Sequence, residues 1–452
     1  MNKQLHTLLN DSFSHYKSRQ LKKALNAAQI ALEFGLNENG HAADLIDANL
    51  LLVRIYNTNG RYQNNFSFFE KAQYHVEEAE KLNSQLNDPN KAVTIKMFAG
   101  RIFINKKNFA KARQCLDEAL ALATQINNHE GVAGTMSLLS KLSILQNQVD
   151  QAVEWAQKAL NWLEENIKTN HLQLWTDAWL YLSNAYLRKQ DYSKSLEISQ
   201  ELLRGSRQGG HIEKEIFALR NIAVVCGVKS NYKIGMQYFL EALDKCKSIG
   251  YQELYAQLQV NIGTLYAHLY NYPEAIRRYK NVLHAHNNYL EDKNKLVIFN
   301  NLGNIYLSTH QPNSALEYFE KAYRLAQQLR IKAMQAHALA QLGRAKLQLN
   351  RLEEAKNDTI TAQCLIDQLG NINGKQINLL NRAEIHFREG SLECAQKLTQ
   401  KAIEAARLVK DDACEIRGYK HLSKVFKAKG DYKTALEYEE KYGKIQEAFA
   451  KE

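Results

Sequence analysis

A repeat of 40 residues constrains the fold of this chain more than any other feature of its sequence. Seven residues, from Tyr192 to Tyr432, follow one another at six identical intervals of 40, and four upstream residues continue the series at intervals of 43, 40, 47 and 41. So regular a register predicts a row of similar structural units. We call these eleven residues the anchors: Leu21, Tyr62, Phe109, Val149, Tyr192, Tyr232, Tyr272, Pro312, Leu352, Leu392 and Tyr432.

Small residues at fixed distances from the anchors predict that each unit is a pair of packed helices. Alanine, serine or glycine stands three residues after every anchor except Tyr62, where Asn65 is found. A small residue such as Gly100 or Gly303 stands nine residues before most anchors. Between the anchors, apolar residues recur at steps of three and four, as in residues 315–326, which is the period of a helix. We therefore expect each anchor to mark the turn before a second helix.

Composition agrees with long helices joined by short turns. Only 3 of the 452 residues are proline and 21 are glycine, so residues that break helices are scarce. No run approaches the ~18 apolar residues of a membrane-spanning helix, and residues 1–6 do not begin a signal peptide. The six cysteines form no C-x-x-C pair, so we interpret them as reduced structural residues. We expect a cytoplasmic protein.

Two segments carry a resemblance to a known repeat family. Residues 301–306, Asn-Leu-Gly-Asn-Ile-Tyr, with Ala315 and Ala322, resemble the consensus of the tetratricopeptide repeat, and residues 261–266 are similar to it. The resemblance runs from about residue 5 to 445 and is strongest from 172. It implies an all-α, right-handed superhelical solenoid of about eleven helical hairpins, with a concave groove lined mainly by first helices. We divide the chain into 1–170, with about four less regular repeats, and 171–452, with about seven regular repeats continuous with the first part.

The 40-residue period is similar to that of adaptors with Leu-Gly-Asn motifs, of bacterial quorum-sensing peptide receptors and of the sensor halves of bacterial signalling proteins. This resemblance implies that the chain binds another protein or a peptide. Two hypotheses follow from it. The chain is an adaptor or scaffold that holds a partner segment in its groove, or it is a sensory and regulatory region whose output module is absent or acts in trans.

Catalytic motifs are absent from the sequence. It contains no G-x-x-x-x-G-K-[ST], G-x-G-x-x-G, G-x-S-x-G or H-E-x-x-H pattern. The glycine-rich stretch 204–211 lies between predicted helices, so we interpret it as a turn between repeats. His284 and His286 are two residues apart on a predicted helix and make a poor metal pair. We therefore expect no enzymatic activity, no catalytic residue, no metal and no cofactor.

Two positions on the first helices are candidates for ligand binding, because the family's groove is lined there. Eleven residues before the anchors, asparagines could pair with a peptide backbone; alternatively they follow the consensus and satisfy a local polar surface. Eight residues before the anchors, basic side chains could hold carboxylates; alternatively this is an exposed position that tolerates charge. The first set is Asn221, Asn261, Asn301 and Asn381, and the second is Arg54, Arg101, Lys141, Asn184, Asn304, Arg344 and Lys424, with Glu384 its only acid.

Nucleic acid is the competing ligand class, because the net charge is +11. The charge is diffuse, however, and no basic-aromatic pattern recurs at the groove positions. We therefore predict that the partner is a protein or peptide segment of acidic character and that no nucleic acid or membrane is involved. The sequence does not indicate the oligomeric state.

Overall fold

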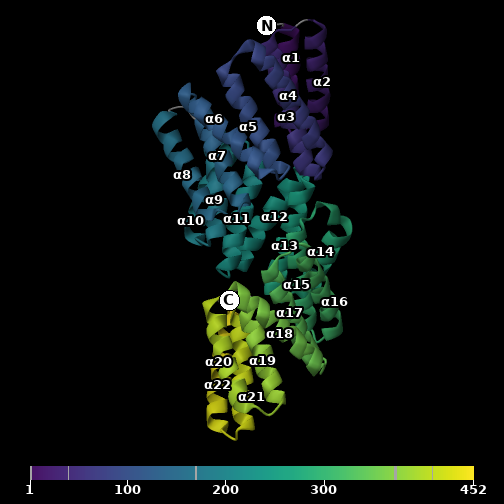
Figure 1. Ribbon diagram of the computed structural model, residues 1–452, viewed down its shortest axis with the longest axis vertical. Coiled ribbons are helices and arrows are strands. Elements are labelled where there is room, and N and C mark those ends of the chain that lie inside the picture. The colour runs from purple at the N-terminus through teal and green to yellow at the C-terminus, as the bar shows by residue number, and fades with distance from the viewer. Residues whose placement is uncertain (1–2, 39, 168–170, 371–373, 410, 452) are drawn as a thin grey trace. The chain divides into compact units, whose positions relative to one another are not determined.

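The computed structural model describes residues 3–38, 40–167, 171–370, 374–409 and 411–451, with side chains as far as residue 445. This part of the chain forms 22 α-helices, one short 3-10 helix (η1, Asn287–Tyr289) and no strand (Figure 1). The helices alternate along the chain as first and second helices of hairpins, and ten such pairs pack closely, among them α1 with α2 and α21 with α22. The predicted all-α chain of eleven helical hairpins is thereby confirmed. None of the helices described is long and apolar enough to cross a membrane.

The helices fall into two compact units. Unit 1 comprises Met1–Leu265 with Ala285–Tyr289, and unit 2 comprises Tyr266–His284 with Leu290–Glu452. The predicted division at residue 170 concerned the regularity of the repeats and stays a prediction. The helices of unit 1 are α1 (Lys3–Lys17), α2 (Leu21–Asn37), α3 (Ala42–Gln63), α4 (Phe66–Leu86), α5 (Pro89–Asn105), α6 (Phe109–Gln125), α7 (His129–Leu145), α8 (Val149–Asn166), α9 (Leu172–Lys189), α10 (Tyr192–Gln208), α11 (Ile212–Val228), α12 (Tyr232–Ile249) and most of α13 (Gln252–His268).

Unit 2 continues the series of hairpins with the same alternation of helix and short turn. Its helices are α14 (Tyr272–Ala285), α15 (Asp292–Ser308), α16 (Pro312–Gln328), α17 (Lys332–Gln348), α18 (Leu352–Leu369), α19 (Lys375–Arg388), α20 (Leu392–Leu408), α21 (Asp412–Ala428) and α22 (Tyr432–Lys451).

The anchors mark helix starts, as the sequence predicts. Ten of the eleven are the first residue of a second helix, for example Leu21 of α2 and Pro312 of α16. Proline is favourable there because the first residues of a helix need no N–H partner. The residue two positions before each second helix has a positive φ, which ends the first helix in a left-handed turn. These turn residues are Arg19, Asn64, Lys107, Asn147, Gln190, Ser230, Tyr270, His310, Asn350, Gly390 and Gly430.

Close contacts at the small residues hold the two helices of a hairpin together. A Cβ atom on Gly100 would lie 2.7 Å from the Leu116 side chain, and one on Gly303 would overlap the ring of Phe319. Leu116 and Phe319 are both fully buried. The small residues before the anchors are therefore required by the packing of the core.

Hairpin 2, which consists of α3 and α4, departs from the predicted register. Tyr62 does not begin a second helix but lies near the end of α3, and α4 begins at Phe66. Gly60 takes the place of the small residue that meets the second helix, because a Cβ atom on it would lie 2.6 Å from the Phe69 ring. Nine residues separate Gly60 from Phe69, whereas 16 separate Gly303 from Phe319. The prediction that Tyr62 marks the turn was wrong, because α3 continues past Tyr62 to Gln63 and the left-handed turn residue is Asn64.

Candidate functional site

A row of basic side chains runs across the first helices α3, α5 and α7 of unit 1, one residue after the packed small residue of each of these helices. Gly100 of α5 packs against the second helix of its hairpin and is followed by Arg101. Ser140 of α7 also packs against the second helix of its hairpin, because its hydroxyl donates to the carbonyl oxygen of Ala152 at 2.7 Å. Lys141 follows Ser140. The first helices α5 and α7 pack side by side (Figure 1), so Arg101 and Lys141 occupy equivalent places in neighbouring repeats.

Hairpin 2, formed by α3 and α4, contributes a third member to this row. Gly60 is the small residue of α3 that packs against the second helix, and Arg61 follows it. Arg54, which the sequence placed in the row, lies seven residues earlier on α3 and so on the same side of that helix. We use the name basic row for Arg61, Arg101 and Lys141.

A pocket of about 310 Å³ opens on the surface formed by the first helices α3, α5, α7 and α9. One wall is apolar and includes Met97, Phe98 and Leu174. Arg54 and Arg101 also line it, with guanidinium groups 5.0 and 6.0 Å from the centre of the Phe98 ring. We call this surface the inner face of unit 1. Its mixture of apolar and charged groups is typical of a ligand pocket.

Lys141 lies in a cationic environment beside the pocket. Its Nζ donates to Oδ1 of Asn105 at 3.3 Å, and Nδ2 of Asn105 donates to Oδ1 of Asn57 at 2.7 Å. Burial lowers the pKa of Lys141 to about 7, with Arg61 and Arg101 contributing in the same direction. A nearby anion would stabilise the protonated form of this lysine.

Three cations of the inner face have no acid at ion-pair distance among the described residues, namely Arg54, Arg101 and Lys141. Burial also lowers the pKa of Arg54. Positive charges held close together without counter-charges repel one another. The inner face is therefore suited to receive negative charge.

The predicted Asn184 and Asn221 are linked to each other where α9 meets α11. Asn221 is fully buried, and its Nδ2 donates to Oγ of Ser183 at 2.8 Å and to Oδ1 of Asn184 at 2.9 Å. The guanidinium of Arg220 donates to Oδ1 of Asn184 at 3.0 Å and to Oδ1 of Asn221 at 2.8 Å. Burial lowers the pKa of Arg220 to about 10. These bonds join two repeats and favour a structural role for Asn221; Asn261, on α13, is half-buried.

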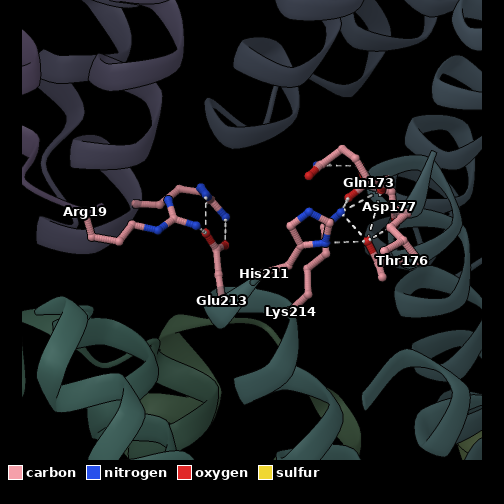
Figure 2. A network of polar contacts seen from close by, with 9 residues as sticks. Arg19, Gln173, Thr176, Asp177, His211, Glu213 and Lys214 are labelled. Carbon is pink, nitrogen blue, oxygen red and sulfur yellow. Dashed lines mark hydrogen bonds and ion pairs between the residues drawn. The ribbon is translucent and has the colours of Figure 1, made fainter. Parts of the chain in front are cut away.

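Two acidic groups near the basic row, Asp177 and Glu213, are already engaged, and a third acid, Glu130, lines the pocket 3.4 Å from His171. Figure 2 shows that Glu213 and Lys214, successive residues of α11, point toward different clusters. Nζ of Lys214 lies 2.9 Å from the Asp177 carboxylate and donates to Oγ1 of Thr176 at 2.8 Å. Burial lowers the pKa of Lys214. Nδ1 of His211 lies 3.2 Å from the same Thr176 hydroxyl oxygen. Asp177 is thereby neutralised within its own cluster.

Glu213 ties the closed ends of hairpins 1 and 2 to the start of α11, and we call this contact the closure. Arg61 forms a bidentate ion pair with Glu213, in which one Nη–Oε distance is 3.1 Å. Arg19 lies 3.8 Å from the same carboxylate, and the Tyr62 hydroxyl donates to it at 3.4 Å. The Tyr62 ring stacks on Tyr251 at 4.4 Å between ring centres. The Arg61–Glu213 pair joins residues 152 apart in sequence.

Electrostatics at the closure favour an ionised Glu213. Burial by itself would raise the pKa of this carboxyl group, but Arg61 and Arg19 lower it, with a net result of about 2. The side chain is only 13% exposed. Buried charges are stable when they are paired and hydrogen-bonded, and Glu213 satisfies both conditions.

In unit 2, the predicted asparagines make contacts within the protein. Nδ2 of Asn301 donates to the Tyr279 hydroxyl at 2.8 Å. Asn381 is buried and donates to the carbonyl oxygen of Ala340 at 2.6 Å. Asn304 is half-buried on α15. The bond made by Asn381 favours a structural role, because it ties α19 to α17.

The predicted basic residues of unit 2 differ in their surroundings. Burial lowers the pKa of Arg344 to about 9, and Arg417 contributes to this shift. Lys424 is exposed, and its Nζ lies 3.3 Å from the carboxylate of Glu384. That carboxylate also pairs with Arg388 at 2.7 Å. The acidic member of the predicted row is therefore neutralised by its neighbours.

Sequence reasoning missed several residues of this site, among them Arg61, Asp177, Glu213 and Lys214. Arg61 had a readable signal, because the pair Gly60-Arg61 repeats the pattern of Gly100-Arg101. The other three contact partners in different repeats, and no local pattern marks them.

Comparison with known proteins identifies the repeats. A family model described as tetratricopeptide repeat matches residues 91–165, 254–328 and 297–357. The kinesin light chain-related protein 1 of Arabidopsis thaliana is 23% identical over 199 residues, which span 43% of this chain and 32% of that protein.

Solved structures share the fold. The apo form of the quorum sensor NprR from B. thuringiensis superposes with a TM-score of 0.63 at 14% identity, over 79% of this chain and 100% of that one. A Rap protein complexed with competence and sporulation factor gives 0.53 at 15% identity, over 82% and 99%. NprR in complex with its cognate peptide NprX gives 0.50 at 19% identity, over 67% and 87%. Residues 91–165 and 254–357 thus match the tetratricopeptide-repeat model, and the described chain shares with these structures the fold of a row of helical hairpins.

Proposed function

We propose that the inner face of unit 1 binds a segment of another protein, and that the chain works as an adaptor or scaffold. The observation that carries this proposal is the group of cations without acidic partners, Arg54, Arg101 and Lys141, around a pocket with an apolar wall. An acidic segment with an apolar side chain complements both features.

Physical considerations set the strength and character of such binding. Partly solvated charges contribute ~0.5–2 kcal/mol each and are weakened by salt. Apolar contact with Met97 and Phe98 adds area-dependent stabilisation of roughly 25 cal/mol per Å². Specificity then comes from the charged contacts, and affinity comes from the charged and apolar contacts together. We expect moderate affinity that falls as the salt concentration rises.

The titles of two related structures name a bound peptide or factor: NprX for NprR, and competence and sporulation factor for the Rap protein. Their likeness to this chain concerns the fold. This likeness supports the proposal, because a solenoid with this fold is able to hold a peptide. Asn184, Asn261, Asn304 and Arg344 are further candidate contacts on first helices, whereas the internal bonds of Asn221 and Asn381 make them supports of the surface.

Selection from a library of random short peptides tests the proposal without a known partner. We expect peptides selected on the parent protein to be rich in Asp and Glu. They should bind Arg101→Glu much more weakly, because the reversed charge repels them. Lys158→Glu is the matched control, since Lys158 pairs with Glu154 on the exposed side of α8. Selected peptides that bind Arg101→Glu like the parent but lose affinity for Lys158→Glu would place the binding site on the outer face.

A second candidate function is that of a sensory and regulatory region, and the closure favours it. A contact made by a few side chains between distant hairpins is able to open without unfolding either one. Ligand binding that changes this contact would transmit a signal to an output module. A distance measured between spin labels on α4 and α12 should change when a selected peptide binds; an unchanged distance would leave the scaffold as the better description.

Three further expectations belong to this proposal. The cytoplasmic location and the exclusion of nucleic acid stay predictions, to be checked by fractionation and by nucleic-acid binding assays. No group of three His, Cys, Asp or Glu side chains is placed to hold a metal ion among the described residues. That the chain is not an enzyme also stays a prediction. Turnover that one point mutation abolishes would contradict it.

A further inference from the structure

The closure shows how one member of the basic row binds a carboxylate. Arg61 follows the packed Gly60, and its two guanidinium Nη atoms donate to the two oxygens of the Glu213 carboxylate. A planar guanidinium is well suited to this arrangement, because its parallel N–H groups match the two carboxylate oxygens. Glu213 is 13% exposed. The chain therefore carries an internal example of a carboxylate seated on the basic row.

Arg101 belongs to the next first helix along the chain, α5. It follows the packed Gly100 as Arg61 follows Gly60. Its neighbour in the row is Lys141, which approaches from α7. No carboxylate among the described residues takes the place beside Arg101 that Glu213 takes beside Arg61. The pocket lined by Arg101 gives access to this place from solvent.

We propose that Arg101 and Lys141 form a carboxylate-binding subsite, which takes an Asp or Glu side chain of the bound protein segment. This inference rests on the proposed function, since the carboxylate belongs to that segment. Arg101 supplies paired N–H donors, and Lys141 supplies an ammonium group. Asn105 holds Lys141 in place through its Oδ1.

Binding at this subsite is coupled to protonation of Lys141. The charged groups that face Lys141 are Arg61 of α3, Arg101 of α5, Asp177 of α9 and Glu213 of α11. Both acids are paired with other cations, so the lysine is surrounded by an excess of positive charge. Burial and these cations hold its pKa at about 7. A ligand carboxylate stabilises the ammonium form, and the protein takes up a proton as it binds.

Titration calorimetry with hexaglutamate, blocked at both ends, tests this proposal on the full chain. Measurements in Tris and in phosphate, which differ in heat of ionisation, give the number of protons taken up. We expect uptake approaching one proton near pH 8, where Lys141 is mostly neutral, and little uptake near pH 6, where it is already charged. Affinity should rise by up to about tenfold per pH unit as the pH falls from 8 toward 7.

Three variants separate the subsite from general charge effects. Lys141→Arg keeps a charge that does not titrate, so it should bind without proton uptake. Arg101→Gln should weaken binding by about tenfold or more at every pH. The control Lys158→Met removes an exposed charge from α8 and should leave both affinity and proton uptake unchanged.

The possible results distinguish the subsite from the proposed function. Proton uptake that persists in Lys141→Arg, or parental affinity in Arg101→Gln, would overturn the subsite. If peptides selected on the inner face bind while hexaglutamate does not, the subsite is also wrong although the function stands. If neither selected peptides nor hexaglutamate bind, the proposed function itself fails. Circular dichroism of each variant confirms that a loss of binding is not a loss of folding.

Discussion

Replacing Glu213 by glutamine tests whether the closure stabilises unit 1. Glutamine keeps the shape of the side chain and removes its charge, which leaves Arg61 and Arg19 facing each other without an acid between them. The pKa of Glu213 falls from an ordinary 4.5 to about 2. A difference of this size corresponds to about 3 kcal/mol of interaction with the charged form. We expect Glu213→Gln to lower the free energy of unfolding of unit 1 by about 2–3 kcal/mol.

Tryptophan fluorescence during urea unfolding measures this effect selectively. All four tryptophans, Trp155, Trp162, Trp175 and Trp179, belong to unit 1, so their signal reports its unfolding. Glu201→Gln is the control, because Glu201 pairs with Arg204 on the exposed side of α10. Surface pairs contribute only about 0–1 kcal/mol.

The stabilisation of unit 1 by Glu213 depends on pH in a definite direction. A carboxyl group with a depressed folded-state pKa stabilises the protein above its unfolded pKa, and that stabilisation is lost as the pH falls through the folded pKa. The difference between the parent and Glu213→Gln should therefore be complete above about pH 5 and should shrink from about 4.5 toward 2. Equal midpoints for Glu213→Gln and Glu201→Gln at neutral pH would refute the view that the closure stabilises unit 1.

Three other substitutions probe the repeats and the inner face. Gly303→Leu should lower the melting temperature more than Glu317→Leu, because a side chain at Gly303 overlaps the buried Phe319 ring whereas Glu317 is exposed; equal melting temperatures would contradict the assigned packing. Lys141→Met should stabilise unit 1 by about 1–2 kcal/mol at pH 7, and the gain should shrink as the pH rises and vanish above 10.5, where the parent lysine is neutral in both states; a gain independent of pH would exclude its charge as the cause. His310→Gly should raise stability by about 0.5–1 kcal/mol in thermal unfolding, because His310 is exposed and has a φ of 57° that glycine adopts without strain; a destabilised variant would show that the imidazole makes contacts that stabilise the turn.

The fold could be predicted from sequence because every hairpin repeats the same local requirements. The small residue, the turn and the second-helix start recur at fixed distances, so ten of the eleven helix starts were predicted correctly. The prediction failed for hairpin 2 because an aromatic residue there has a different role. Tyr62 resembles an anchor in type and spacing, yet its ring stacks on Tyr251 at the closure. Residue type alone does not distinguish these two roles.

The candidate site was predictable only where it follows the repeat. Arg101 and Lys141 share an offset from their anchors, and the structure places them on neighbouring first helices. The partners of Arg61 and Lys214 depend instead on how far successive hairpins rotate. Small rotations accumulate over several repeats, and no single segment encodes their sum. Contacts across 152 residues, such as that of Glu213, therefore had no signature in the sequence.

The closure also limits where unit 1 can receive an acidic ligand. Arg61 and Arg19 are occupied by Glu213, and Lys214 is occupied by Asp177. The cations that remain without an acidic partner lie between these two clusters, on α3, α5 and α7. The apolar pocket opens among the same helices and α9. Because Arg61 is neutralised from within the chain, an acidic segment is directed to the other two members of the basic row, Arg101 and Lys141, beside the pocket.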